Sequence, residues 1–300
     1  MPSAFAAALD DAALVISCID QPQRGLLHAT IERGLRYTDI TPHLTQLGRG
    51  AAYEQIDAAA RASGSRVLLG AGLVPGISSV MVRAVADTVG GADTIETALV
   101  LSVGDATGPA SLDYFLQELT MPFDVHVNGA DHRARAFSEP RMVDFPSPVG
   151  RRRAYLFPFS DQVLYPRTLG ARTARSRLAL DPPQLARLLA VAVRTGAARI
   201  LAGERLRRAL ARRRRDRNPR HDARFALRVD VARDGRASHA TLVGTAQAEA
   251  TAVGAAGLAR SLLDGEVREP GAWMPEQVVD PACFFAYLER HGFGIAVGQL

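Results

Sequence analysis

The chain has 300 residues, 47% of them hydrophobic, so a sizeable core can form in one large domain or two smaller ones. Its only cysteines, Cys18 and Cys283, are too few for a disulfide framework. The formal net charge is +5 and no lysine occurs, but ten arginines and two acidic residues between Arg205 and Arg224 give that run +8 and leave −3 for the rest. The basic character therefore belongs to one segment rather than to the whole surface.

The N-terminus has no basic segment followed by an apolar run, so we expect no signal peptide. Arginines interrupt the apolar stretch from Leu185 to Gly203, which makes it a poor membrane span. From the sequence we therefore expect a cytoplasmic protein.

The first seventy residues alternate short apolar runs with helical patterns. Continuous apolar runs suit strands that are covered on both faces, and Gly34 stands where a left-handed helix cap is expected. The expected order is a strand at 14–16, a helix at 23–33, a strand at 37–41, a helix at 53–63 and a strand at 67–69. This alternation predicts a right-handed parallel sheet.

The character of the chain changes near Asp93. Before it, apolar residues from Ile77 to Val85 follow a helical period. After it, apolar residues from Ile95 to Val103 alternate with mostly polar or small ones, as in a strand of an antiparallel or mixed sheet. We place a domain boundary there.

The rest of the chain gives further local predictions. Helices are expected at 112–119, from Pro183 toward residue 195, at 252–263 with a small-residue face, and after Asp280 as N-cap. Asn128-Gly129 and Asp234-Gly235 predict hairpins. Residues 294–297 are expected to form the last strand.

Three stretches together resemble the saccharopine dehydrogenase-like family, also called saccharopine reductase-like oxidoreductases. They are LVISCIDQP with RYTDIT, LLGAGLVPGISSVM, and GAWMPEQVVDPACFFAYLERHGFGI. The middle of the chain also fits, through GPASLDYFL, PSPVGRRRAYLFPFSDQ and LYPRTLG. The resemblance covers nearly the whole chain, and its most specific parts are the AGL-x-PG turn and the PE-x-V-x-D-P block.

The resemblance implies an α/β protein with an incomplete Rossmann-type parallel sheet. A second, mixed α/β domain for substrate binding and dimerisation is inserted before the chain returns to the first. In this sequence the first domain would span residues 1–92 and be completed by 245–300, with the second at 93–244. The last strand, at 294–297, is expected to rejoin the first domain.

The family opens with a strand, a G-x-G-x-x-G turn and two further strand–helix units, whereas this sequence begins at the helix before the fourth strand. A truncated gene model, a misplaced start codon and a genuine short protein all remain open. The resemblance implies NADP or NAD as cofactor, but the phosphate-binding loop and the ribose-reading residue are absent from this sequence. We therefore expect this chain to bind NADPH or NADH weakly or not at all.

The candidate site residues stand at the expected carboxyl ends of the strands, where open α/β sheets bind ligands. The residues expected beside the cofactor are Cys18, Ile19, Asp20, Ile40, Thr41, Ala71, Gly72, Leu73, Pro75 and Gly76. Asp39 is the candidate catalytic residue, which would orient a substrate amine or hold a proton. Alternatively, Asp39 and Thr41 cap the next helix. For Cys18 we favour a buried strand cysteine over a nucleophile.

Two further segments have competing interpretations. The turn from Gly70 to Gly76 is similar to a phosphate-binding loop, but the third glycine of that motif would fall at Pro75, which has no N–H to donate. The resemblance implies instead the turn after the sixth strand, beside the nicotinamide. A glycine-rich strand-to-helix turn without a ligand is the remaining alternative. Asp161 and Gln162 either face the substrate cleft or lie in a surface turn.

From the resemblance we predict an NAD(P)-dependent oxidoreductase that acts on a carbon–nitrogen bond of a small amino-acid-derived substrate, as a homodimer. One alternative is a non-catalytic relative that has lost cofactor binding. The other is a nucleic-acid-associated protein acting through Arg205 to Arg224, although a solvated loop is the favoured interpretation of that run. The seven histidines include no pair at metal-ligand spacing, so no metal site is predicted.

Overall fold

The N-terminal part of the chain forms a four-stranded parallel sheet in the order β1-β2-β3-β12. The computed structural model describes residues 7–19, 24–40, 52–103, 109–201, 203 and 223–299. The four strands are β1 (Leu14–Ser17), β2 (Arg36–Asp39), β3 (Arg66–Leu68) and β12 (Gly271–Trp273). Their register pairs Leu14 with Arg36 and Arg36 with Arg66, which confirms the sequential order predicted for the first three.

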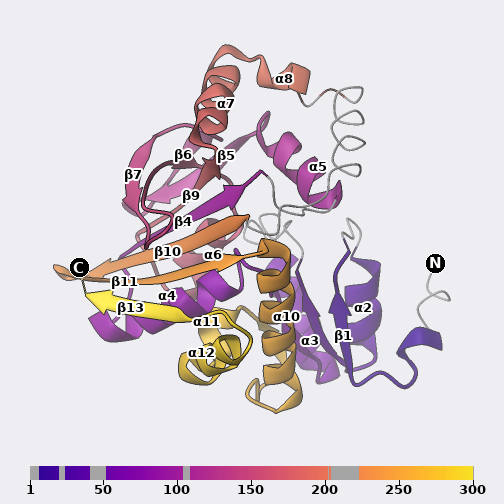
Figure 1. Ribbon diagram of the computed structural model, residues 1–300. Helices are drawn as coiled ribbons and strands as arrows, with labels where there is room; N and C mark the ends of the chain where they lie inside the picture. Colours follow the sequence, from indigo (N-terminus) through magenta and orange to yellow (C-terminus); the bar gives the residue numbers. More distant parts are fainter. Residues whose placement is uncertain are drawn as a thin grey trace.

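Helices cover both faces of this sheet (Figure 1). On one face, α2 (Gly25–Glu32) and α3 (Ala52–Ser63) bury Leu27, Ile31 and Ile56 in a common core. On the other face stands α10 (Gln247–Leu263), whose small-residue face was predicted. A Cβ added at Gly254 would lie 2.7 Å from the side chain of Ile77, so the small residues also let α10 approach its neighbouring helix.

Helix α4 (Ile77–Val89) leads from the parallel sheet to a second sheet of nine strands. Its main path is β13-β11-β10-β4-β9-β5-β6, and β8 pairs with both β9 and β7. The strands are β4 (Thr94–Ser102), β5 (Pro122–Val127), β6 (Ala130–Arg135), β7 (Arg141–Asp144), β8 (Arg151–Leu156), β9 (Thr173–Asp181), β10 (Arg224–Arg233), β11 (Arg236–Thr245) and β13 (Ile295–Gln299). Because β4 is parallel to β9 and antiparallel to β10, the predicted mixed sheet is confirmed.

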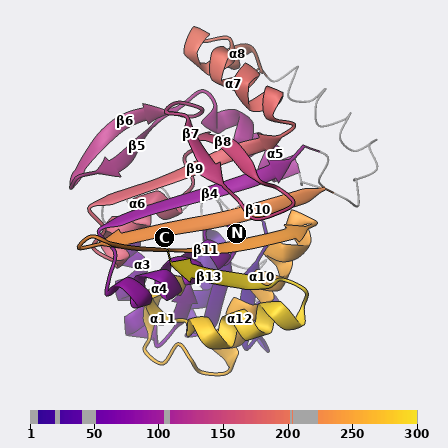
Figure 2. The ribbon, with the colours of Figure 1, turned by 60° about the vertical axis from the view of Figure 1, so that its left-hand side comes forward.

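The remaining named helices pack on this second sheet or on the helices beside it. They are α5 (Pro109–Glu118), α6 (Asp161–Thr168), α7 (Pro183–Thr195), α8 (Ala198–Leu201), α11 (Pro275–Val278) and α12 (Pro281–Arg290). One face of the sheet packs on α4, where Ile95, Leu227 and Leu242 join the largest core cluster. Figure 2 shows β4, β9, β10 and β11 running side by side, with β7 and β8 over part of the sheet.

Two hairpins and one helix cap form as the sequence predicts. Turns at Asn128-Gly129 and Asp234-Gly235 join β5 to β6 and β10 to β11. Asp280 caps α12, because its carboxylate accepts a hydrogen bond of 2.8 Å from the Cys283 N–H.

The prediction for the last strand is wrong in one respect. Residues 295–299 form the strand β13, but it pairs antiparallel with β11 in the nine-stranded sheet instead of rejoining the parallel sheet. The strand that returns to the parallel sheet is β12, which pairs with β3. The chain thus returns before its last strand, and the domain limits near residues 93 and 245 stay a prediction. No helix in the described part of the chain is long and apolar enough to cross a membrane.

Candidate functional site

The carboxyl ends of the parallel strands bring Asp39 to the turn that follows β3. The Asp39 Oδ1 atom accepts a hydrogen bond of 3.0 Å from the Gly70 N–H, and its backbone oxygen accepts one of 2.6 Å from the Ala71 N–H. The carboxylate therefore joins two neighbouring strand ends, a role that differs from the helix cap considered as an alternative. Thr41 and Asp20 lie outside the described residues.

Polar and charged groups surround the buried Asp39 carboxylate. The Tyr37 hydroxyl lies 3.4 Å from Oδ2 and donates to it. Burial, and then the negative charge of Asp39, raises the pKa of Tyr37 well above its usual range, so this hydroxyl keeps its proton. Burial lowers the pKa of Arg24, an effect that attraction to Asp39 opposes. The result is an oriented acceptor at the edge where sheet ligands bind.

The residues that follow β1 and β2 are accessible. Ile19 is 64% exposed, Cys18 is exposed and Ile40 is half-buried. The prediction that Cys18 is a buried strand cysteine is therefore wrong, because β1 ends at Ser17 and the thiol lies just beyond it. Cys18 and Cys283 are both free thiols.

The glycine-rich turn after β3 is closed on itself. The five candidate residues Ala71, Gly72, Leu73, Pro75 and Gly76 are all buried. The N–H groups of Ile77 and Ser78 donate to the carbonyls of Gly72 and Leu73 at 2.9 and 3.0 Å. A phosphate cradle needs free N–H groups at the helix start, so the structure speaks against that interpretation of the turn. A position of these residues beside the nicotinamide stays a prediction.

Asp161 and Gln162 do not lie in a surface turn, because both are buried at the start of α6. Asp161 Oδ1 accepts hydrogen bonds from the Ser176 hydroxyl at 2.7 Å and from the Gln162 N–H at 2.8 Å. Gln162 Oε1 accepts one of 3.2 Å from the Ser176 N–H. The two residues fasten α6 to β9.

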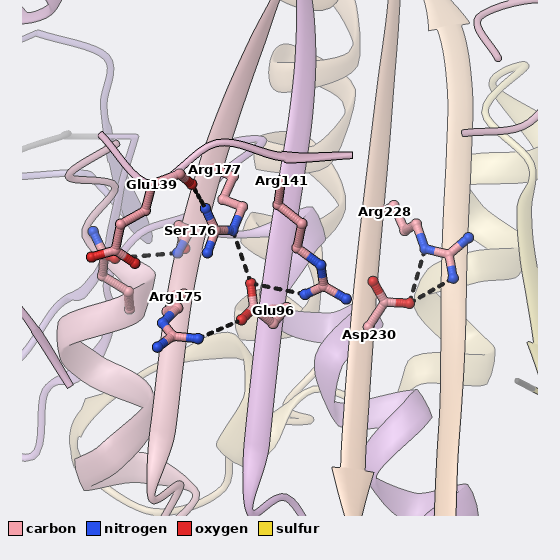
Figure 3. Close-up of polar contacts among 9 residues, drawn as sticks. Glu96, Glu139, Arg141, Arg175, Ser176, Arg177, Arg228 and Asp230 are labelled. Atoms are coloured by element: carbon pink, nitrogen blue, oxygen red, sulfur yellow. Dashed lines mark hydrogen bonds and ion pairs between the residues drawn. The ribbon is translucent and has the colours of Figure 1, made fainter. Parts of the chain in front are cut away.

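A separate charged cluster lies on the nine-stranded sheet, away from the strand ends of the parallel sheet. Figure 3 shows Arg141, Arg175 and Arg177 converging on Glu96, while Arg228 pairs with Asp230 on a neighbouring strand. The three guanidinium groups lie 3.1–3.3 Å from the Glu96 carboxylate. Because this buried acid holds β4, β7 and β9 together, we assign it to stability.

The structure also shows hollows whose linings include neither Asp39 nor the residues expected beside the cofactor, although Gln162 lines one of them. One of about 320 Å³ lies between the β5–β6 hairpin and α6, with Asp124, His126, Asp131 and Arg167 among its lining residues. These charged groups are already paired, as in the contact of 2.7 Å between His126 Nδ1 and Asp131 Oδ1. Within the described ranges, no three His, Cys, Asp or Glu residues gather where they could hold a metal ion.

Sequence reasoning missed two buried groups, Tyr37 and Glu276. Tyr37 precedes Asp39 by two residues, so alternation along the strand places both side chains on one face. Glu276 is the first of the two acidic residues of the PE-x-V-x-D-P block, which was the available signal. Of the arginine run, the structure describes only the end: Arg224 begins β10 with an exposed side chain, and residues 204–222 lie outside the described part.

Comparison with known proteins identifies the fold of the chain. No protein-family model and no curated protein matches the chain. Saccharopine dehydrogenase (L-Glu forming) from Saccharomyces cerevisiae matches with a TM-score of 0.66 and 14% identity, over 100% of this chain and 87% of that one. An amine dehydrogenase from Mycobacterium smegmatis matches with a TM-score of 0.44 and 8% identity, over 93% and 79% of the two chains. On the first of these matches, the chain has a saccharopine dehydrogenase-like fold.

Proposed function

We propose that the chain is an NAD(P)-dependent oxidoreductase that acts on a carbon–nitrogen bond of a small amino-acid-derived substrate. The observation that carries the proposal is the buried Asp39 carboxylate at the carboxyl edge of a parallel sheet. The sheet belongs to a fold that matches a saccharopine dehydrogenase over 100% of this chain and 87% of that one. Ligands of such sheets bind at this edge.

The residues at this edge fit a nicotinamide ring. Exposed Ile19 and half-buried Ile40 offer apolar surface for a flat ring, beside the polar groups of Asp39 and Tyr37. Cys18, Asp20 and Thr41 belong to the same proposed contact set. A bound nicotinamide supplies or accepts the hydride, while the protein orients the partners and excludes water.

Asp39 has the role of holding the substrate amine. Its two oxygens are fixed by Gly70 and Tyr37, which leaves the carboxylate in one orientation. A positively charged amine gains a charge-assisted hydrogen bond from such an acceptor, and the same carboxylate can accept a proton as the amine changes its bonding.

The replacement Asp39→Asn tests this role. The amide keeps an oxygen that can accept from the Gly70 N–H but loses the negative charge. We expect turnover with secondary-amine substrates to fall by about 10²-fold or more, and the acidic limb of the pH–rate profile to move. Turnover is measured as the change in nicotinamide absorbance, with secondary amines formed from two amino acids as substrates. The matched control is Asp87→Asn, which removes an exposed carboxylate on α4 and should change nothing. Unchanged turnover in Asp39→Asn would remove Asp39 from the mechanism.

Cofactor binding is a separate test. The turn at 70–76 is closed on itself, and the sequence contains no other glycine-rich phosphate loop, so we expect only weak binding of NADPH and NADH by these 300 residues. Several charge-assisted bonds of about 1.5–3 kcal/mol each would be missing, which removes most of a micromolar affinity. Isothermal titration with each nucleotide measures this affinity. Turnover is then assayed at nucleotide concentrations well above the measured Kd. A low-micromolar Kd would contradict the expected weakness; no binding at any concentration would favour the non-catalytic relative.

We also propose a homodimer, since the resemblance assigns dimerisation to the second domain. Part of the nine-stranded sheet, around β10 and β11, has no described helix over one face (Figure 2). Light scattering after size exclusion should give twice the 32.1 kDa of one chain. A mass of one chain at micromolar concentration would contradict this proposal.

A further inference from the structure

Helix α6 carries a row of polar side chains into the interior of the protein. Asp161, Tyr165 and Thr168 stand at positions i, i+4 and i+7 and therefore share one face of the helix. Asp161 and Tyr165 are almost completely buried. The Tyr165 hydroxyl lies 3.4 Å from Asp161 Oδ2 and donates to it.

This row meets a second buried acid, Glu276 of α11, directly after the returning strand β12. Glu276 is 1% exposed. Its Oε1 atom accepts a hydrogen bond of 2.7 Å from the Thr168 hydroxyl. Its Oε2 atom is buried and has no hydrogen-bond partner. The contact joins α6, which is fastened to β9 of the nine-stranded sheet, to the end of the parallel sheet.

The groups around the two acids supply no neutralising cation. Tyr114 of α5 and Tyr165 face Asp161, and Tyr53 of α3 and Tyr165 face Glu276. Arg83 of α4 bonds to the Glu276 backbone oxygen and pairs with Asp87, while Arg167 of α6 pairs with Glu54. Within the described residues neither buried acid makes an ion pair. A buried carboxylate without a counter-ion is costly, so its protonated form is favoured.

Burial raises the pKa of both acids. Burial raises the pKa of Asp161 to about 6, against the hydrogen bonds from Ser176 and Gln162. Burial also raises the pKa of Glu276, and the nearby charge of Asp161 adds to the effect, while Thr168 opposes it.

We infer that Asp161, Tyr165, Thr168 and Glu276 form a proton-operated lock between α6 and the returning end of the parallel sheet. With both acids protonated, the layer is neutral and the contact stays closed. Loss of a proton leaves a buried charge with no counter-ion, and the contact between α6 and α11 loosens. The lock is independent of the proposed oxidoreductase activity.

The direction in which stability changes with pH follows from the direction of the two pKa shifts. A carboxyl whose pKa is higher in the folded than in the unfolded state binds more protons when folded, so stability falls as the pH rises through both values. For Asp161 the window runs from its ordinary value of 3.8 to about 6. Its titration alone should increase the opening equilibrium constant about tenfold between pH 5 and 7.

The test is hydrogen exchange measured by mass spectrometry at both pH values, corrected for the intrinsic exchange rate. In the unmodified chain we expect protection of α6 and α11 to fall about tenfold from pH 5 to 7 relative to the β10–β11 hairpin, an internal reference. Asp161→Asn keeps the Oδ1 acceptor and Glu276→Gln keeps the size, so each should reduce this fall. Asp144→Asn, at a side chain 74% exposed outside the reference hairpin, should leave it unchanged.

Two results would overturn the inference. One is equal pH dependence in α6, α11 and the hairpin of the unmodified chain. The other is an unreduced fall in a folded Asp161→Asn variant, which decides the question alone should Glu276→Gln fail to fold. A fall that disappears in Asp161→Asn and persists in Asp144→Asn supports the lock.

Discussion

Replacing Gly76 with alanine is expected to lower the free energy of unfolding by more than about 4 kcal/mol. Gly76 has a φ of 127°, which L side chains rarely adopt. A Cβ atom there would lie 2.1 Å from the Gly72 carbonyl oxygen and 2.5 Å from the Gly72 nitrogen, both of them backbone atoms. The neighbouring residues are buried, so the turn has little room to relax. Chemical denaturation followed by circular dichroism measures the change.

The matched control is Gly64→Ala. Gly64 has a φ of 77°, but a Cβ atom there would meet no atom within 4 Å. Only conformational strain remains, with an expected cost of about 1–2 kcal/mol. Equal losses in the two variants would show that the turn at residues 72–76 opens without cost. This turn would then again be a candidate phosphate-binding loop.

The local elements could be predicted because their signals are local. The apolar runs at residues 14–16 and 67–69 identify covered strands, and the turns at Asn128 and Asp234 identify hairpins. Since parallel strands end at one edge, the approach of Asp39 to Gly70 also followed from the order of strands.

Long-range pairing could not be predicted in the same way. The sequence predicts a last strand at residues 294–297 but carries no information on its partner, which is β11. The returning strand β12 has only three residues, too few for a pattern. Asp161 is polar and near a turn in sequence, and only the contact with Ser176 on β9 explains its burial. The pairing of β12 and β13 and the burial of Asp161 therefore could not be predicted without the tertiary structure.

Replacing Glu96 with glutamine is expected to lower the free energy of unfolding by about 3 kcal/mol. The Glu96 side chain is 10% exposed and that of Arg177 only 5%, so little water screens this pair. Without the carboxylate, the neighbouring guanidinium groups of Arg175 and Arg177 on β9 repel each other across a partly buried site. Arg141 is half-exposed and adds little. Chemical denaturation at low and high ionic strength measures the loss, which salt should change only slightly.

Asp144→Asn is the control for Glu96→Gln, since it removes a carboxylate from the same surface in an exposed setting. Asp144 and Arg151 lie 3.5 Å apart with side chains 74% and 66% exposed. Such pairs contribute about 0–1 kcal/mol and are screened by salt, so the expected loss is about 0.5 kcal/mol or less. If Glu96→Gln costs no more than this control, water reaches the arginine cluster. The three guanidinium groups would then be a solvated basic patch rather than the fastening between β4, β7 and β9.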